Sequence, residues 1–266
     1  RLLGLAYASK FYRQNKELTA LKGFSDGGNE VAFGTIGDAG TSEGLFFETF
    51  NAAGVLQVPM VISVWDDGYG ISVPKKHQTT KGSISECLKG FQRDPKKIKE
   101  GENGEGFEIF KAMGWDYAGL CNTYQKAVKI AREKHIPVLI HVDEMTQPQG
   151  HSTSGSHQRY KTKERLKWEV DFDCITKMKE WMLESEIASK QNLEQLENEA
   201  KQYVKQSQKE AWNDFQLPIK QEVSEVSALI EKIAKQSEHG ELILKIRKDL
   251  NALISFERRN VLEAAK

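Results

Sequence analysis

Short apolar segments alternate with helical patterns in the first part of the chain. The apolar segments, which are rich in β-branched residues, cover residues 31–37, 60–65 and 136–142, and the helical patterns cover about 42–57, 105–113 and 122–134. Strands that are apolar along nearly their whole length are typical of a parallel sheet that is covered on both faces. We therefore predict an α/β fold, a parallel sheet with helices on both faces, for residues 1–160.

After about residue 160 the pattern becomes helical and strongly charged. Apolar positions recur at helical spacing, as in Leu193, Leu196, Ala200 and Tyr203 and again in Ile243, Ile246, Leu250 and Leu253. Each series predicts a helix with one apolar stripe, which needs a partner in the same domain or in another chain. We expect helices that pack on the α/β domain over residues 161–217, and a helical extension or linker over 218–266.

Composition narrows the possible partners. The 266 residues include 38 Lys and Arg against 38 Asp and Glu, a balance that does not favour a nucleic-acid-binding protein. No apolar run approaches the roughly 20 residues of a membrane span, and no signal sequence or capping residue precedes the helical pattern of residues 1–15. The three cysteines lie far apart, as is typical of reduced thiols. We expect a cytoplasmic protein, a piece of a longer polypeptide, that binds neither nucleic acid nor a membrane.

Two acidic residues follow consecutive predicted strands. The segment that holds them, residues 34–74, is GTIGDAGTSEGLFFETFNAAGVLQVPMVISVWDDGYGISVP. Asp38 ends the first strand and Asp67 ends the second, and the helical crossover between them brings both strand ends to one edge of a parallel sheet. Gly37 and Gly40 allow a close approach of the backbone to an anion, and the helix that starts near Ser42 offers unpaired N–H groups. This arrangement is typical of a diphosphate site.

A divalent cation follows from the charges at this site. Two carboxylates would repel a diphosphate unless a hard cation such as Mg²⁺ lay between them. The alternative is structural: Asp38 would be a helix N-cap, and Asp67 with Gly68 would form an ordinary turn. Either aspartate alone favours the alternative, whereas the two together with the glycines favour the metal site.

These residues resemble a known family. The GDAG turn, the FNAAGVLQVP helix and the DDGYGIS sequence look like the thiamine-diphosphate and magnesium motif of 2-oxo acid dehydrogenases, and more narrowly the alpha subunit of their decarboxylating first component. KHIPVLIHVDEMTQPQGHSTSGSHQRY, residues 134–160, is similar to the last strand and the histidine-bearing loop of that subunit. The resemblance covers about residues 1–217 and is closer to branched-chain members than to pyruvate members.

The resemblance implies roles for particular residues. Asp38, Asp67 and the carbonyl of Tyr69 would be the magnesium ligands. The cofactor-binding residues would be Gly37, Asp38, Ala39, Gly40, Asp67, Tyr69, Ile71 and His151, and His151 would also be catalytic. The chain departs from the family in having Asp67 where Asn is usual, and Gln147 and Gln149 where several relatives have an arginine.

The resemblance also implies an activity and partners. The activity would be thiamine diphosphate-dependent oxidative decarboxylation of a 2-oxo acid, either 3-methyl-2-oxobutanoate or pyruvate. The acyl group would pass to a lipoyl-bearing acyltransferase, and a beta-type subunit or fused domain would complete the site in a homodimer or an alpha2beta2 assembly. Two alternatives stay open: a transketolase-like transferase, and a cofactor-binding domain that is inactive without its beta-type partner.

Other features have weaker implications. His157 is a second candidate in the loop, whereas His77, His135, His141 and His239 are expected to be structural or surface residues, and Trp65 to be a core residue. Residues 94–106 predict a polar surface loop. Residues 144–160 predict a loop that becomes ordered when cofactor binds, and in some relatives the positions of Ser152 and Ser154 are phosphorylated.

Overall fold

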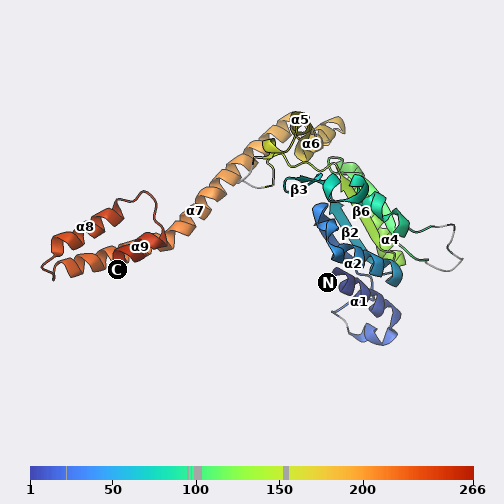
Figure 1. Ribbon diagram of the computed structural model, residues 1–266, viewed down its shortest axis with the longest axis horizontal. Coiled ribbons are helices and arrows are strands. Elements are labelled where there is room, and N and C mark those ends of the chain that lie inside the picture. The colour runs from blue at the N-terminus through green and yellow to red at the C-terminus, as the bar shows by residue number, and fades with distance from the viewer. Residues whose placement is uncertain (22, 95, 97, 99–103, 152–155) are drawn as a thin grey trace. The chain divides into compact units, whose positions relative to one another are not determined.

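The computed structural model describes residues 1–266 except 22, 95, 97, 99–103 and 152–155. The chain divides into two compact units, residues 1–187 and residues 188–266 (Figure 1). Helix α7 (Lys190–Ala234) of the second unit is continuous across residues 217 and 218. The division of the chain into an α/β domain, packed helices and an extension stays a prediction.

A four-stranded parallel sheet forms the centre of the first unit. Its strand order is β1 (Ala32–Gly37), β2 (Met60–Trp65), β6 (Val138–Asp143) and β5 (Glu108–Met113). The first five residues of β2 and of β6 are all buried, as expected for strands in the middle of a covered sheet. The three predicted strands are confirmed.

Helices cover both faces of this sheet. On one face α1 (Leu2–Gln14) and α2 (Gly44–Leu56) pack against alternate residues of β2, including Met60 and Val64. On the other face α4 (Tyr117–Lys134) packs against Val61 and against residues of β6. Because successive residues of a strand point to opposite faces, each central strand contributes to both cores. The predicted α/β fold is confirmed.

The helix that we predicted over residues 105–113 is wrong. Residues Glu108–Met113 form β5, which pairs in parallel register with β6 at the edge of the sheet. Its short apolar pattern suits a helix or a strand equally, and tertiary pairing decides between them. The next helix, α4, begins at Tyr117 and is capped by Asp116, whose carboxylate accepts from the Gly119 N–H at 2.9 Å.

Short elements connect the main ones. They are η1 (Lys16–Ala20), η2 (Ala39–Ser42), the hairpin of β3 (Tyr69–Gly70) and β4 (Val73–Pro74), η3 (Lys75–His77), η4 (Thr80–Gly82), α3 (Ile84–Cys87), η5 (Leu88–Phe91), η7 (His157–Arg159), α5 (Lys163–Asp171) and α6 (Cys174–Glu184).

The second unit is a small helical assembly. It consists of α7 (Lys190–Ala234), α8 (Gly240–Asn251) and α9 (Arg258–Ala265), and the last two lie against the C-terminal half of α7 (Figure 1). Its core contains Ile219, Val223, Leu250 and Val261. None of the helices in the described part of the chain combines the length and the apolarity that crossing a membrane would need.

Candidate functional site

The carboxyl ends of β1 and β2 lie side by side, as the crossover spacing predicts. Gly37 is the register partner of Trp65 in this parallel pair. The Asp38 N–H donates to the Trp65 carbonyl at 3.1 Å. Asp38 and Asp67, which follow these strands, therefore come to the same edge of the sheet, where α/β proteins commonly bind ligands.

A cavity of about 390 Å³ opens at this edge. It is lined by Gly37, Asp38, Ala39, Trp65, Asp67, Tyr69, Gly70, Ile71, Met145, Thr146, Gln147 and His151. All the predicted site residues except Gly40 are among them, and their binding of a cofactor stays a prediction. A Cβ on Gly37 would meet no atom within 4 Å, whereas one on Gly40 would lie 2.9 Å from the Ile36 side chain. Gly37 thus leaves open room beside its backbone, and Gly40 allows close packing against β1.

Asp38 is buried without a partner for one of its oxygens. The residue is 5% exposed, and its Oδ2 has no hydrogen-bond partner. Its carbonyl accepts from the N–H of Thr41 at 3.1 Å and from the Thr41 hydroxyl at 2.6 Å, while its side chain makes no capping hydrogen bond to η2. Asp38 therefore stands at the N-cap position of η2 but does not cap it through its carboxylate.

The environment of Asp38 disfavours a negative charge. Burial raises the pKa of its carboxyl from 3.8 to about 7, and the neighbouring carboxylates of Asp66 and Asp67 contribute to the increase. The Ala39 N–H and Lys75 act in the opposite direction and do not compensate. A cation beside such a carboxyl would favour its ionised form and lower its pKa.

Asp67 and Tyr69 form the second side of the site. The Asp67 Oδ1 accepts from the Tyr69 N–H at 3.1 Å, and burial raises the pKa of this carboxyl. Tyr69 stands opposite Pro74 in the β3–β4 hairpin, and proline has no N–H to donate to the Tyr69 carbonyl. Gly68 lies in a bend with a φ of +83°, which glycine adopts without strain.

The turn rests on a buried network that the sequence analysis missed. Asp66 Oδ2 accepts from Lys75 Nζ at 2.8 Å and from His141 Nε2 at 2.9 Å. Asp66 Oδ1 accepts from the Gly68 N–H at 2.9 Å. Burial opposes ionisation of Asp66, but the hydrogen bonds from His141 and Lys75 outweigh it and lower the pKa of this carboxyl. The signal in the sequence was a histidine inside an apolar strand, which needs a buried partner.

This network is an ion-pair cluster and not a second metal site. Ligand atoms of Asp66, His141 and Asp143 lie within 4.8 Å of one another. However, Lys75 Nζ bonds both Asp66 and Asp143, the latter at 3.2 Å, and so supplies the positive charge. The expectation that His141 is structural is confirmed, since it is fully buried and also bonds Ser85 at 2.8 Å.

Trp65 and His151 lie at the cavity. The expectation that Trp65 packs in the core is wrong: this side chain ends β2, is 48% exposed and donates to Ser63 Oγ at 3.1 Å. It follows the last buried residue of the strand, so its apolar neighbours in the sequence do not cover it. His151 is exposed where it lines the cavity, whereas His157 is half-buried and lies outside the lining.

The other expectations have mixed outcomes. His135 is buried and bonds the Gly28 carbonyl at 3.2 Å, and His77 and His239 are exposed, so their structural or surface roles are confirmed. Ser152, Ser154 and much of the expected loop at 94–106 lie outside the described residues. The ordering of residues 144–160 on cofactor binding stays a prediction.

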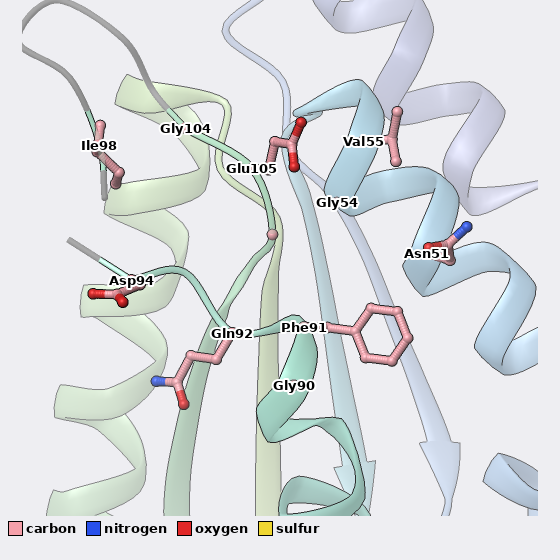
Figure 2. A pocket seen from close by; sticks show the side chains of 11 residues that line it. Asn51, Gly54, Val55, Gly90, Phe91, Gln92, Asp94, Ile98, Gly104 and Glu105 are labelled. Atoms are coloured by element: carbon pink, nitrogen blue, oxygen red, sulfur yellow. The ribbon is translucent and has the colours of Figure 1, made fainter. Parts of the chain in front are cut away.

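A second cavity, of about 470 Å³, lies at the amino ends of the strands, opposite the first. Figure 2 shows that its lining comes from the end of α2 and from the segments that precede β5. Among the described residues that line it, Asp94 and Glu105 are acids. The first cavity is the candidate site, because it lies at the carboxyl ends of the strands and holds the unpartnered Asp38 oxygen.

The donor set of the first cavity suits a hard divalent cation. It offers the unpartnered Asp38 oxygen, the Asp67 carboxylate and a backbone carbonyl at Tyr69. Magnesium takes oxygen ligands of these kinds and completes its shell with water and phosphate oxygens. Both the open backbone at Gly37 and the orphaned Asp38 oxygen fit a diphosphate with its cation.

Comparison with known proteins identifies relatives. The model of the family described as Dehydrogenase E1 component matches residues 2–220. The pyruvate dehydrogenase E1 component subunit alpha of Rickettsia bellii is 26% identical over 204 residues, which cover 77% of this chain and 53% of that protein. The mitochondrial 2-oxoisovalerate dehydrogenase subunit alpha of Dictyostelium discoideum is 30% identical over 149 residues, which cover 55% of this chain and 30% of that protein.

A plant relative matches a longer stretch. The mitochondrial 2-oxoisovalerate dehydrogenase subunit alpha 1 of Arabidopsis thaliana is 25% identical over 218 residues, which cover 80% of this chain and 43% of that protein. The chain spans about half the length of the curated relatives it matches.

Proposed function

Since the chain belongs to the dehydrogenase E1 component family, we propose that its cavity binds thiamine diphosphate with Mg²⁺ for the decarboxylation of a 2-oxo acid. The observation that carries this proposal is the buried, unpartnered Oδ2 of Asp38, which lies in one cavity with Asp67 at the carboxyl edge of the sheet. A buried carboxylate oxygen without a donor is costly unless something that the protein binds completes it.

Each residue of the site has a definite part in the proposal. Asp38 and Asp67 supply one carboxylate oxygen each to the cation, and Tyr69 supplies its backbone carbonyl. The backbone amides of Ala39 and Gly40, at the start of η2, would bind the diphosphate. The Asp67 carboxylate adds a negative charge where the family usually has a neutral amide, which makes the cation essential for diphosphate binding.

The chemistry at the other end of the ligand lies beyond this cavity. When bound, thiamine diphosphate supplies the carbanion that adds to the oxo group and allows carbon dioxide to leave. His151 is exposed and lines the cavity. In the proposal it contacts the diphosphate and lines the path of the substrate. We propose that a beta-type subunit or fused domain completes the site, and that the acyl group passes to a lipoyl-bearing acyltransferase.

The substrate class follows from the relatives. Those that match are named for pyruvate and for 2-oxoisovalerate, so the proposed substrate is a short 2-oxo acid, either pyruvate or 3-methyl-2-oxobutanoate. Transfer of the acyl group to a lipoyl group, measured against ketol transfer to an aldehyde, separates this activity from that of a transketolase-like enzyme. The assay uses the assembly that contains the beta-type partner.

Calorimetric titration with thiamine diphosphate, with and without Mg²⁺, tests the site. We expect binding only in the presence of Mg²⁺, no binding by the Asp38→Ala or Asp67→Ala variants, and retained binding by Asp67→Asn, which keeps an oxygen ligand. Circular dichroism establishes that each variant is folded. Binding of equal affinity after chelation of the metal, or in Asp38→Ala, would contradict the proposal.

A further inference from the structure

Arg165, on α5, is bonded to the backbone of the turn that carries the proposed metal ligands. Its Nη2 donates to the carbonyl of Asp67 at 2.7 Å. The same nitrogen donates to the carbonyl of Met145 at 3.5 Å. Asp67 and Met145 both line the cavity and come from separate segments, after β2 and after β6. One guanidinium group thus connects helix α5 to both cavity-lining segments, through Asp67 and Met145.

The guanidinium is itself held in a fixed orientation. Its Nε donates to Glu169 Oε1 at 2.9 Å, one helical turn further along α5. Glu169 is buried and also accepts from Lys161 Nζ, at 2.7 and 3.0 Å. The guanidinium carbon of Arg165 lies over the Trp168 ring, 4.5 Å from the ring centroid. Because the guanidinium group is planar, a hydrogen bond through Nε and contact with an aromatic ring fix the direction in which its other N–H groups donate.

The Tyr69 side chain is packed against the same groups. The guanidinium carbon of Arg165 lies 5.6 Å from the Tyr69 ring centroid, and Lys161 Nζ lies 5.1 Å from it. The Tyr160 ring lies 5.7 Å away. Cations over an aromatic face stabilise its position. The residue that offers its carbonyl to the metal is therefore held through its side chain, while Asp67 is held through its backbone.

We infer that Arg165 is a positioning residue, which fixes the Asp67–Tyr69 turn in the geometry that the metal site needs. The inference rests on the proposed function. Arg165 does not line the cavity, and it acts through the Asp67 carbonyl and the Tyr69 ring. Metal affinity depends strongly on groups that orient the ligands, because ligands on a loose turn lose conformational freedom when they coordinate. Neither the GDAG nor the DDGYGIS motif contains this residue.

The test compares Arg165→Gln and Arg165→Lys with Lys167→Gln. Lys167 lies on the same helix in an exposed pair with Asp171, so its replacement changes the charge of α5 by the same amount without touching the turn. Lysine at 165 keeps the charge but cannot bond Glu169 and the Asp67 carbonyl as a planar fork does. Three measurements are made on each protein: the Mg²⁺ concentration that half-saturates thiamine diphosphate binding, the unfolding temperature, and hydrogen–deuterium exchange of the Tyr69 amide.

We expect both Arg165 variants to need about ten- to a hundredfold more Mg²⁺ and to exchange the Tyr69 amide faster. Their unfolding temperatures should fall only modestly, because Glu169 keeps its buried partner Lys161. Lys167→Gln should match the parent in all three measurements. An unchanged Mg²⁺ requirement with unchanged Tyr69 exchange would overturn the inference. So would a weaker site that loses protection throughout residues 1–187, because that result indicates a general structural role.

Failure of the proposed function has a different signature. In that case the parent chain binds no thiamine diphosphate with Mg²⁺, and the Tyr69 amide alone decides whether Arg165 holds the turn. Faster exchange that is confined to the turn in both Arg165 variants supports the positioning role, and exchange equal to that of the parent overturns it.

Discussion

The buried carboxyl of Asp38 makes the stability of the folded protein depend on pH. Its buried oxygen has no hydrogen-bond partner, and its pKa is raised from 3.8 to about 7. In the unfolded chain the carboxyl ionises near its ordinary value, so the folded protein loses stability as the pH rises from there to about 7. The cation that we propose for this site would offset this loss, because it favours the ionised carboxylate.

Replacement of Asp38 by Asn should therefore stabilise the metal-free protein at neutral and alkaline pH. We expect a gain on the order of 2 kcal/mol at about pH 8, less than the full pKa shift implies because the cavity admits solvent, and no gain at about pH 4. Urea unfolding in the presence of a chelator measures it. A difference from the parent chain that does not change with pH would contradict the assignment of this pKa to Asp38.

The sequence predicts the polar residues of the site better than their supports. Asp38 and Asp67 are predicted because each follows a strand at the edge where parallel strands meet, whereas Tyr69 is predicted only from the resemblance to a known family. Asp66, which holds the turn, depends on Lys75 and His141 from two other segments, and no local pattern pairs residues so far apart. Trp65 was misplaced for a related reason: an apolar strand predicts burial only as far as neighbouring elements extend.

At the scale of elements, the central strands and the edge strand differ in how well they are predicted. The apolar residues of β2 and β6 continue for most of each strand. This pattern indicates a strand that helices cover on both faces of the sheet, because both of its sides are then buried. β5, at the edge, is half-buried, and its six residues satisfy a helical pattern equally well. Its pairing with β6, a non-local contact, decides its structure.

Helix α5 is fastened by a buried ion pair whose disruption should be costly. The side chains of Lys161 and Glu169 are each 1% exposed. Lys161→Met leaves Glu169 with Arg165 alone, and we expect a loss of about 3 kcal/mol in the free energy of unfolding, the lower end for a broken buried pair. Chemical denaturation monitored by tryptophan fluorescence gives the value, because Trp168 lies in this helix.

Two variants control this measurement. Lys167→Met removes a charge from the exposed pair with Asp171 and should change the stability by less than about 0.5 kcal/mol. The double variant Lys161→Met with Glu169→Met should lose less than Lys161→Met alone, since it leaves no buried charge without its partner. If Lys161→Met costs no more than Lys167→Met, the pair does not fasten α5.

In the second unit, the apolar stripes that the sequence predicts are only partly buried. The helical spacing predicts apolar stripes correctly, but it does not say what covers them. Within the second unit Leu250 is buried, whereas Leu196 and Tyr203, on the first half of α7, are 63% and 74% exposed. A stripe encodes the need for a partner and not its identity.

We expect these 266 residues to bind the cofactor but to have no catalytic activity on their own. The carboxylates among the described lining residues of the cavity are those of Asp38 and Asp67. In the proposed function both bind the cation. Activation of the aminopyrimidine needs a further positioned carboxyl group, which must come from another domain or subunit. We therefore expect decarboxylation of 3-methyl-2-oxobutanoate or pyruvate, followed with an artificial electron acceptor, only when a beta-type partner is present. Turnover by the isolated residues at a rate comparable to that of the assembly would show that the site is complete within this chain.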